Sequence, residues 1–211
     1  MNDEDDEPAE LHDRGARLLR EGRCAEAAAV YGALCRRVPD DACAWYFLGT
    51  VKCTLGDMDG GAACFDRAVA LRPDYVDAHL NRGNVSFHQG RYHEALASYR
   101  IVLQHDPGRA AAHNNCAQIL AHLGRRAEAE RSYRAAIAAD PGAADAYNNL
   151  ANLQAAAGRA DEAAANFRAA LALRPDFALC HNNLGRLLFV EGDFAAAAEH
   201  LIASGWTSPA H

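Results

Sequence analysis

Apolar and polar residues along the chain follow two periods at once. Within short stretches, apolar residues such as Trp45, Leu48 and Gly49 recur at spacings of three and four, which places them on one face of a helix. Over the whole chain, the same pattern returns every 34 residues. Glycines mark this longer period at Gly22, Gly56, Gly90, Gly124, Gly158 and Gly192. Prolines mark it at Pro39, Pro73, Pro107, Pro141, Pro175 and Pro209.

One internal glycine and one closing proline per period predict two helices joined by a tight turn and followed by a stop. The expected structure is therefore all-α, an array of six helical hairpins that touch only their neighbours. Residues 1–7 precede the array, and no linker interrupts it. The predicted repeats are residues 8–41, 42–75, 76–109, 110–143, 144–177 and 178–211. We number the residues of each repeat as positions 1 to 34.

Positions 4, 7, 8 and 11 form the predicted core face of each first helix. Position 8 is glycine or alanine in all six repeats, and position 20 is equally small. Small residues at both positions let two helix backbones approach closely, and an aromatic residue at position 24 fills the adjoining space. That aromatic residue is Tyr31, Phe65, Tyr99, Tyr133 or Phe167 in the first five repeats.

These residues, at these positions, resemble the tetratricopeptide repeat over residues 8–211. The resemblance implies a right-handed α-solenoid, a superhelix whose first helices line a concave groove. Repeat 1 departs from the pattern at Arg14, and repeat 6 departs at Leu201, Ser204 and Gly205. The family typically adds a polar capping helix, which is missing after repeat 6. We expect either that Trp206 folds back over this end or that the end packs on another molecule, as a homo-oligomer through the C-terminal repeat.

Charge and composition narrow the classes of function. The formal net charge of −7 disfavours nucleic acid as a partner, because phosphate binding needs a basic surface. The opening MNDEDDEP lacks the basic and apolar regions of a signal peptide and is expected to be a disordered acidic tail. No apolar run is long enough to span a membrane. Seven cysteines without a CxxC pair indicate reduced packing residues in a cytoplasmic protein.

Asparagine is concentrated at positions 5, 6 and 9 of repeats 3 to 6. These positions lie opposite the core face, so the amides are expected on the exposed face of each first helix. Asparagine lowers helix stability relative to alanine by about 0.5 kcal/mol or more, so its recurrence in register suggests a use. The candidate peptide-binding residues are Asn81, Asn84, Asn114, Asn115, Gln118, Asn148, Asn149, Asn152, Asn182 and Asn183, with Arg186 at position 9 of repeat 6.

The segments HNNCA, AYNNLA and HNNLG at residues 113–117, 146–151 and 181–185 resemble the repeats of O-linked N-acetylglucosamine transferase and its bacterial relatives. That resemblance implies that position-6 asparagines form a ladder along the groove and bind the backbone of an extended polypeptide. The matching residues are Asn81, Asn115, Asn149 and Asn183, whereas Asp13 and Phe47 break the pattern. The alternative is that these amides bond only to neighbouring helices or to water.

Other chemistry finds little support. Ring residues His79, His113 and His181 fall at core position 4 and are expected to be packed, and His93-Glu94 lacks the second histidine of a zinc protease motif. No phosphate-binding or nucleophile motif is present, so we expect no enzyme activity, no cofactor and no metal site. The position-16 residues Arg23, Arg91, Arg125 and Arg159 are expected to form a solvated outer row. Positions 2, 5 and 6 lack the basic residues of carboxylate-clamp tetratricopeptide domains, which bind acidic chaperone tails.

The sequence therefore predicts a protein-interaction scaffold whose groove, mainly in repeats 3 to 6, binds an extended peptide segment of another protein. Two alternatives remain. The chain could be an accessory or substrate-recognition subunit of a separate enzyme such as a glycosyltransferase, whose catalytic domain is absent here. It could also be a self-assembling structural module.

Overall fold

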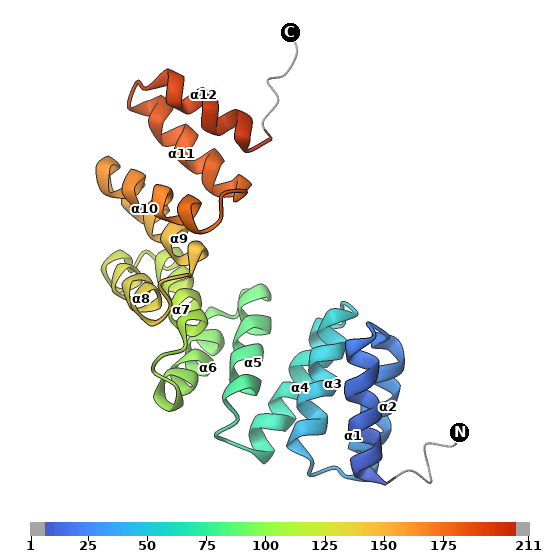
Figure 1. Cartoon of the computed structure of the whole chain (residues 1–211). Helices are drawn as coiled ribbons and strands as arrows, with labels where there is room; N and C mark the ends of the chain where they lie inside the picture. Colours follow the sequence, from blue (N-terminus) through green and yellow to red (C-terminus); the bar gives the residue numbers. More distant parts are fainter. Residues whose placement is uncertain (1–6, 206–211) are drawn as a thin grey trace. The chain divides into compact units, whose positions relative to one another are not determined.

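A computed structural model describes residues 7–205, which contain twelve α-helices and no strand (Figure 1). This confirms the predicted all-α class of six helix-turn-helix pairs. The first helices of the pairs are α1 (Pro8–Arg20), α3 (Ala42–Thr54), α5 (Val76–His88), α7 (Ala110–His122), α9 (Ala144–Ala155) and α11 (Ala178–Val190). The second helices are α2 (Cys24–Arg37), α4 (Met58–Leu71), α6 (Tyr92–His105), α8 (Arg126–Ala139), α10 (Ala160–Leu173) and α12 (Phe194–Ala203).

Glycine ends the first helix of every pair in the left-handed conformation. Gly22, for example, has a φ of 72°, where a side chain would strain the backbone. Its N–H donates to the Leu19 carbonyl, and the next N–H, of Arg23, donates to the Leu18 carbonyl. This pair of bonds is a Schellman motif, which satisfies carbonyls at the end of a helix. The 34-residue glycine period therefore reflects a repeated helix stop.

The second helices begin in two ways. In α4 and α12, the side chains of Asp57 and Asp193 accept hydrogen bonds from backbone N–H groups in the first turn. In the other pairs, an arginine at position 16 bonds to a glutamate three residues later, as Arg23 does to both carboxylate oxygens of Glu26 at 2.7 Å. The position-16 arginines are thus paired with glutamates, whereas the sequence predicted only solvent around them.

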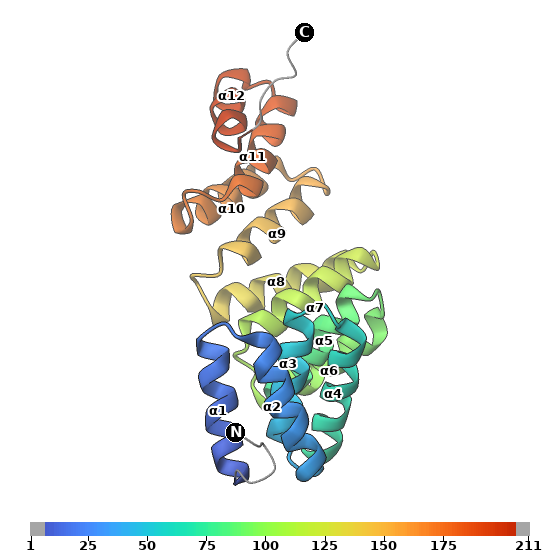
Figure 2. The same cartoon turned by 90° about the vertical axis from the view of Figure 1, so that its right-hand side faces the viewer.

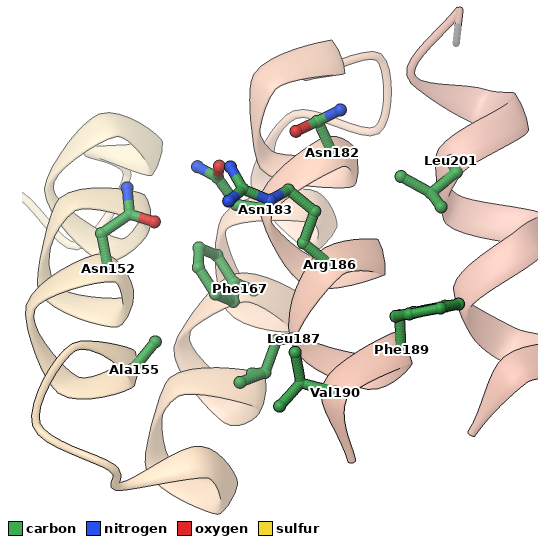
Figure 3. Close-up of a pocket in the computed structure, with 10 residues that line it drawn as sticks. All are labelled: Asn152, Ala155, Phe167, Asn182, Asn183, Arg186, Leu187, Phe189, Val190 and Leu201. Atoms are coloured by element: carbon green, nitrogen blue, oxygen red, sulfur yellow. The ribbon is translucent and has the colours of Figure 1, made fainter. Parts of the chain in front are cut away.

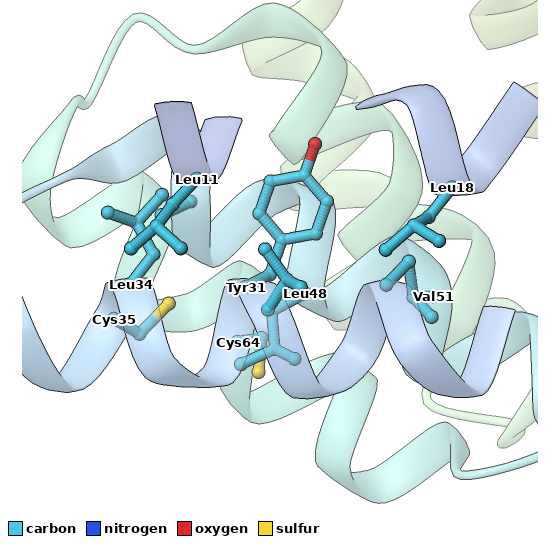
Figure 4. Packing of buried hydrophobic residues seen from close by; sticks show 11 residues of the cluster. Leu11, Leu18, Tyr31, Leu34, Cys35, Leu48, Val51 and Cys64 are labelled. Carbon is cyan, nitrogen blue, oxygen red and sulfur yellow. The ribbon is translucent and has the colours of Figure 1, made fainter. Parts of the chain in front are cut away.

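In the first five hairpins, an aromatic ring at position 24 lies against a small residue at position 8. Tyr31 is fully buried, and a Cβ atom added to Gly15 would lie 2.6 Å from the Cζ atom of its ring. Contacts closer than about 3.5 Å between carbon atoms are repulsive, so only glycine fits there. Figure 4 shows this ring among Leu11, Leu48 and other apolar side chains of the first two hairpins.

The chain forms two compact units, an N-terminal unit up to Pro107 and a C-terminal unit from Gly108 onward. Each unit is a stack of three hairpins (Figure 2). In the C-terminal unit, each second helix packs against the next first helix, α8 against α9 and α10 against α11. The first helices of this unit also touch one another, α7 with α9 and α9 with α11. Their side chains can therefore interact across repeat boundaries.

The ends of the described region bear on three predictions. Most of the predicted acidic tail and Trp206, the predicted cover of repeat 6, lie outside the described residues. Glu7 belongs to the start of α1 rather than to a tail, because its N–H donates to Glu10 Oε2 at 3.1 Å. All seven cysteines are described and free, and none of the described helices is long and apolar enough to cross a membrane.

Candidate functional site

Every predicted binding residue lies on a first helix. Asn81 and Asn84 are on α5, in the N-terminal unit. The other nine are in the C-terminal unit, on α7, α9 and α11, and the site is built from these three helices. They are Asn114, Asn115, Gln118, Asn148, Asn149, Asn152, Asn182, Asn183 and Arg186.

Five of these amides form one hydrogen-bonded chain across three repeats. Between repeats, the position-6 amide donates to the position-5 amide of the preceding repeat. Asn183 Nδ2 thus donates to Asn148 Oδ1 at 3.1 Å, and Asn149 Nδ2 to Asn114 Oδ1 at 3.2 Å. Within a repeat, position 5 donates to position 6, from Asn148 to Asn149 at 3.4 Å and from Asn114 to Asn115 at 3.3 Å. We call these five residues the amide chain.

Burial along the amide chain differs from the prediction of a fully exposed face. Asn148 is only 2% exposed, and the other four members are half-buried. The reason is that α9 lies between α7 and α11 and touches both, so its position-5 side chain is enclosed. A buried amide must be hydrogen-bonded, and Asn148 is bonded through both its nitrogen and its oxygen. Asn152 and Arg186, at position 9, are exposed.

The internal bonds use only part of the capacity of the amides. A primary carboxamide has two N–H donors and two acceptor lone pairs. Asn149 donates one hydrogen bond, to Asn114, and accepts one, from Asn148. One donor and one acceptor of this half-buried side chain are left for other groups. The arrangement can therefore both join the repeats and offer paired polar groups to a guest.

A pocket of about 680 Å³ lies at one end of the amide chain (Figure 3). Its polar lining comes from Asn152, Asn182, Asn183 and Arg186, four of the predicted residues. Its apolar lining is Ala155, Phe167, Leu187, Phe189, Val190 and Leu201. Figure 3 shows Asn152, Asn183 and the guanidinium of Arg186 together above Ala155, Leu187 and Val190. The pocket thus has a polar part and an apolar part, side by side.

The N-terminal unit has a different surface on its first helices. Asn84 Oδ1 accepts a hydrogen bond from the hydroxyl of the buried Tyr99 at 2.8 Å, so this oxygen bonds to a core residue. Asn81 Nδ2 lies 3.5 Å from the hydroxyl of Tyr46, a weak contact. At position 6 of repeat 2, Phe47 stacks on Tyr31 with ring centroids 5.2 Å apart. In this unit, rings occupy places that amides hold in the other.

A hydrogen bond from the position-4 ring to a proline carbonyl recurs along the chain and was not predicted from the sequence. The position-4 rings do not simply pack: Trp45 Nε1 donates to the Pro39 carbonyl at 2.9 Å. His79 Nε2 and His181 Nε2 make the equivalent bonds, both 2.9 Å, to Pro73 and Pro175. The signal was the constant spacing of six residues between the proline and a ring that carries N–H. These bonds tie the end of one repeat to the start of the next.

Two histidine side chains in the described region have shifted pKa values. Burial lowers the pKa of His79 and, together with the neighbouring His181, that of His200. His181 Nδ1 and His200 Nδ1 lie 2.9 Å apart, at the contact of α11 with α12. Among residues 7–205, no three His, Cys, Asp or Glu side chains are grouped so as to hold a metal ion.

Comparison with known proteins points to one repeat family. The family model described as tetratricopeptide repeat matches residues 12–52, 53–110, 89–144, 117–176 and 148–204. Protein FlbA of Caulobacter vibrioides is 36% identical over 91 residues, which are 43% of this chain and 15% of FlbA. The chain thus spans less than a fifth of that relative.

Solved structures share the fold at low sequence identity. PilW, described as a widely conserved type IV pilus biogenesis factor, has a TM-score of 0.83 and 21% identity, over 96% of this chain and 95% of PilW. YrrB, described as a TPR protein with an unusual peptide-binding site, has a TM-score of 0.66 and 19% identity, over 84% of this chain and 91% of YrrB.

Proposed function

The chain belongs to the tetratricopeptide repeat family, whose arrays act as protein-interaction scaffolds, and we propose that its C-terminal unit binds an extended peptide segment of another protein. The guest lies across α7, α9 and α11 and bonds through its backbone to the amide chain. The observation that carries this proposal is the half-used hydrogen-bonding capacity of Asn149. The described peptide-binding site of YrrB, a protein of similar fold, supports the class of ligand.

The spacing of the amides suits a strand-like guest. Packed helices lie about 8 to 10 Å apart, and an extended peptide rises about 3.3 Å per residue. Successive position-6 amides, Asn115, Asn149 and Asn183, would therefore meet the guest about once every three residues. A carboxamide offers a donor and an acceptor to the C=O and N–H of the guest backbone, so binding would tolerate many side chains. The resemblance of these segments to the repeats of O-linked N-acetylglucosamine transferase agrees with this use.

The competing use of the amide chain is to hold neighbouring repeats together. The two uses separate when binding and stability are measured on the same variants. We expect the double variant Asn115→Ala and Asn149→Ala to lose capture of peptides from a displayed random library while keeping its helical circular dichroism. Gln104→Ala, which removes an exposed amide on α6, is the control and should keep both properties. Capture that is unchanged in the double variant would refute the ladder.

Self-assembly through the last hairpin is a second candidate function. Four of its apolar side chains are exposed: Phe189 by 58%, Val190 by 79%, Phe194 by 62% and Ile202 by 73%. If this surface joins copies of the chain, the mass measured by light scattering should rise with concentration, and Ile202→Asp should abolish the rise. A mass that stays at one chain over the whole concentration range would exclude self-assembly.

A role beside a separate enzyme, such as a glycosyltransferase, follows from the same resemblance of the asparagine segments. In that case, the proposed guest is the substrate protein or the enzyme itself. A transferase encoded next to this chain, and co-purification with it, would support this assignment. We place the scaffold in the cytoplasm, where its free cysteines stay reduced.

A further inference from the structure

We propose that the pocket over α11 selects guests that carry an acidic residue and a large apolar residue with one residue between them. This inference rests on the proposed peptide-binding function and specifies its partner. It names the side chains that the guest presents at one end of the amide chain, where backbone bonding alone would accept any sequence.

The apolar part of the pocket calls for an apolar side chain. Ala155 of α9 and Leu187 and Val190 of α11 line this part of the pocket together with the buried ring of Phe167 (Figure 3). Val190 is 79% exposed, which leaves much of its apolar surface in water. A leucine, isoleucine or phenylalanine of a guest would cover this surface, whereas a short polar side chain would not.

The charge of the polar part calls for an anion. Arg186 is the only Lys or Arg on α7, α9 and α11, and no ion pair joins it to a carboxylate of the described residues. The only acidic residue on these helices, Asp145, is already paired with Arg174 at 2.8 Å. A guanidinium binds a carboxylate through two parallel hydrogen bonds, and Asn152 and Asn183 stand beside it as further donors.

The surrounding charge does not oppose an acidic guest. The C-terminal unit has nine arginines and ten acidic residues, a formal charge of −1. Most of the net charge of −7 therefore belongs to the N-terminal unit. Arg186 acts within the pocket at short range, where the attraction between opposite charges is strongest.

The guest crosses α7 and α9 and turns at its end to run along α11, so the spacing of its two side chains follows from that helix. Arg186 and Val190 are four residues apart on one helix, a rise of about 6 Å. In an extended segment, residues separated by one other residue point to the same side, about 6.6 Å apart. Neighbouring residues point to opposite sides and cannot both enter the pocket. The match fixes the pattern as an acidic residue, any residue and a large apolar residue, read in either direction along the guest.

Selection from a displayed library of random peptides tests the inference on the intact chain. We expect the enriched peptides to carry this pattern more often than the starting library. A synthetic peptide with the pattern, labelled for fluorescence anisotropy, should bind about tenfold or more tightly than its Glu→Gln form, because a charged hydrogen-bond pair is lost. Arg186→Glu should reverse this preference in favour of a lysine-containing peptide, and Arg168→Glu on α10 is the matched control.

The outcomes separate this inference from the proposed function. If the chain selects peptides that lack the pattern, and Asn115→Ala with Asn149→Ala weakens them, backbone binding stands and the pocket assignment fails. If no peptide is selected at all, both fail. A rise in mass with concentration that Val190→Asp abolishes would assign the pocket to a second copy of the chain and overturn the inference. Circular dichroism of each variant excludes unfolding as the cause.

Discussion

The two units are built from the same type of hairpin but carry different side chains on their first helices. At positions 5 and 6, the N-terminal unit has His12 and Asp13, Tyr46 and Phe47, and Leu80 and Asn81, whereas the C-terminal unit has three successive asparagine pairs. In the first case, rings pack against one another, as Tyr46 does edge-on against Phe47 with centroids 5.2 Å apart. In the second, amides bond to one another.

This difference shows that one set of residues specifies the packing of the hairpin, and another set specifies the surface at positions 5 and 6 of its first helix. Aromatic residues at position 24 are buried in both units, with Tyr99 fully buried and Phe167 1% exposed. Positions 5 and 6 can touch this ring, as Phe47 does by stacking on Tyr31, yet they differ between the units while the ring stays buried in both. In repeat 2, aromatic side chains hold these positions, whereas Asn149 of the amide chain keeps one donor and one acceptor. This difference supports the proposal that the C-terminal unit binds the guest.

The largest expected effect tests the shared part of the comparison. Phe65→Ala in the N-terminal unit and Phe167→Ala in the C-terminal unit each remove a ring that is 1% exposed. Each should lower the free energy of unfolding by about 3 to 5 kcal/mol, because both leave a cavity. Urea denaturation followed by circular dichroism measures the two costs. A loss in one unit only would show that the hairpins are not equivalent.

Removing the buried amide should have the next largest effect. Asn148→Ala leaves Asn149 Oδ1 and Asn183 Nδ2 without the partner that the 2% exposed Asn148 side chain provides. We expect a loss of about 1 to 3 kcal/mol in the free energy of unfolding. Asn152→Ala, at the exposed position 9 of the same helix, should change stability little. Equal costs for the two variants would mean that the amide chain does not join the repeats.

Position 8 sharpens the comparison further, since it is glycine throughout the N-terminal unit but alanine in repeats 4 and 5. A Cβ atom at Gly83 would lie 2.5 Å from Tyr99 Cε1, and this ring is fully buried and bonded to Asn84. Overpacking costs about 1 to 3 kcal/mol, whereas alanine gains about 1 kcal/mol over glycine in a helix. We expect Gly83→Ala to lower the melting temperature. A rise would show that the ring can move aside.

The smallest effect is on the pH dependence of stability. Burial lowers the pKa of His200 below its ordinary 6.5, with His181 adding to the effect, and burial also lowers the pKa of His79. The unfolded chain then binds protons more readily than the folded chain, so stability should fall as the pH drops below 6.5. Each proton contributes at most about 1.4 kcal/mol per pH unit.

Urea titrations above and below pH 6.5 measure this dependence. His200→Gln should flatten it for the C-terminal unit and His79→Gln for the N-terminal unit. Profiles that are identical in the wild-type chain and both variants would show that neither ring resists protonation.

The sequence predicted the helices well because their boundaries are set locally. Gly22 and its five equivalents end a helix in the left-handed conformation, and that requirement is visible in a single residue. The core contacts could also be predicted from the sequence, since the small Gly15 and the large Tyr31 indicate by their sizes that they pack closely.

The candidate site was only partly predictable, because its bonds join different repeats. The row of position-6 asparagines is visible in the sequence, but the bond from Asn183 to Asn148 depends on how α11 packs on α9. For the same reason, the burial of Asn148 was missed. The pocket was not foreseen as a cavity, since its lining comes from α9, α10, α11 and α12 together. Single positions specify helices, whereas sites depend on the packing between them.

The amide chain also has a consequence for how the array could lengthen. Residues 144–177 bring both an acceptor for the following repeat, Asn148, and a donor for the preceding one, Asn149. A tandem duplication of this segment would add one repeat to the amide chain, and the new repeat would already carry the donor and the acceptor that bond to its two neighbours. Duplication of whole repeats would thus extend the amide chain, and with it the proposed binding surface, one repeat at a time and without any compensating substitution.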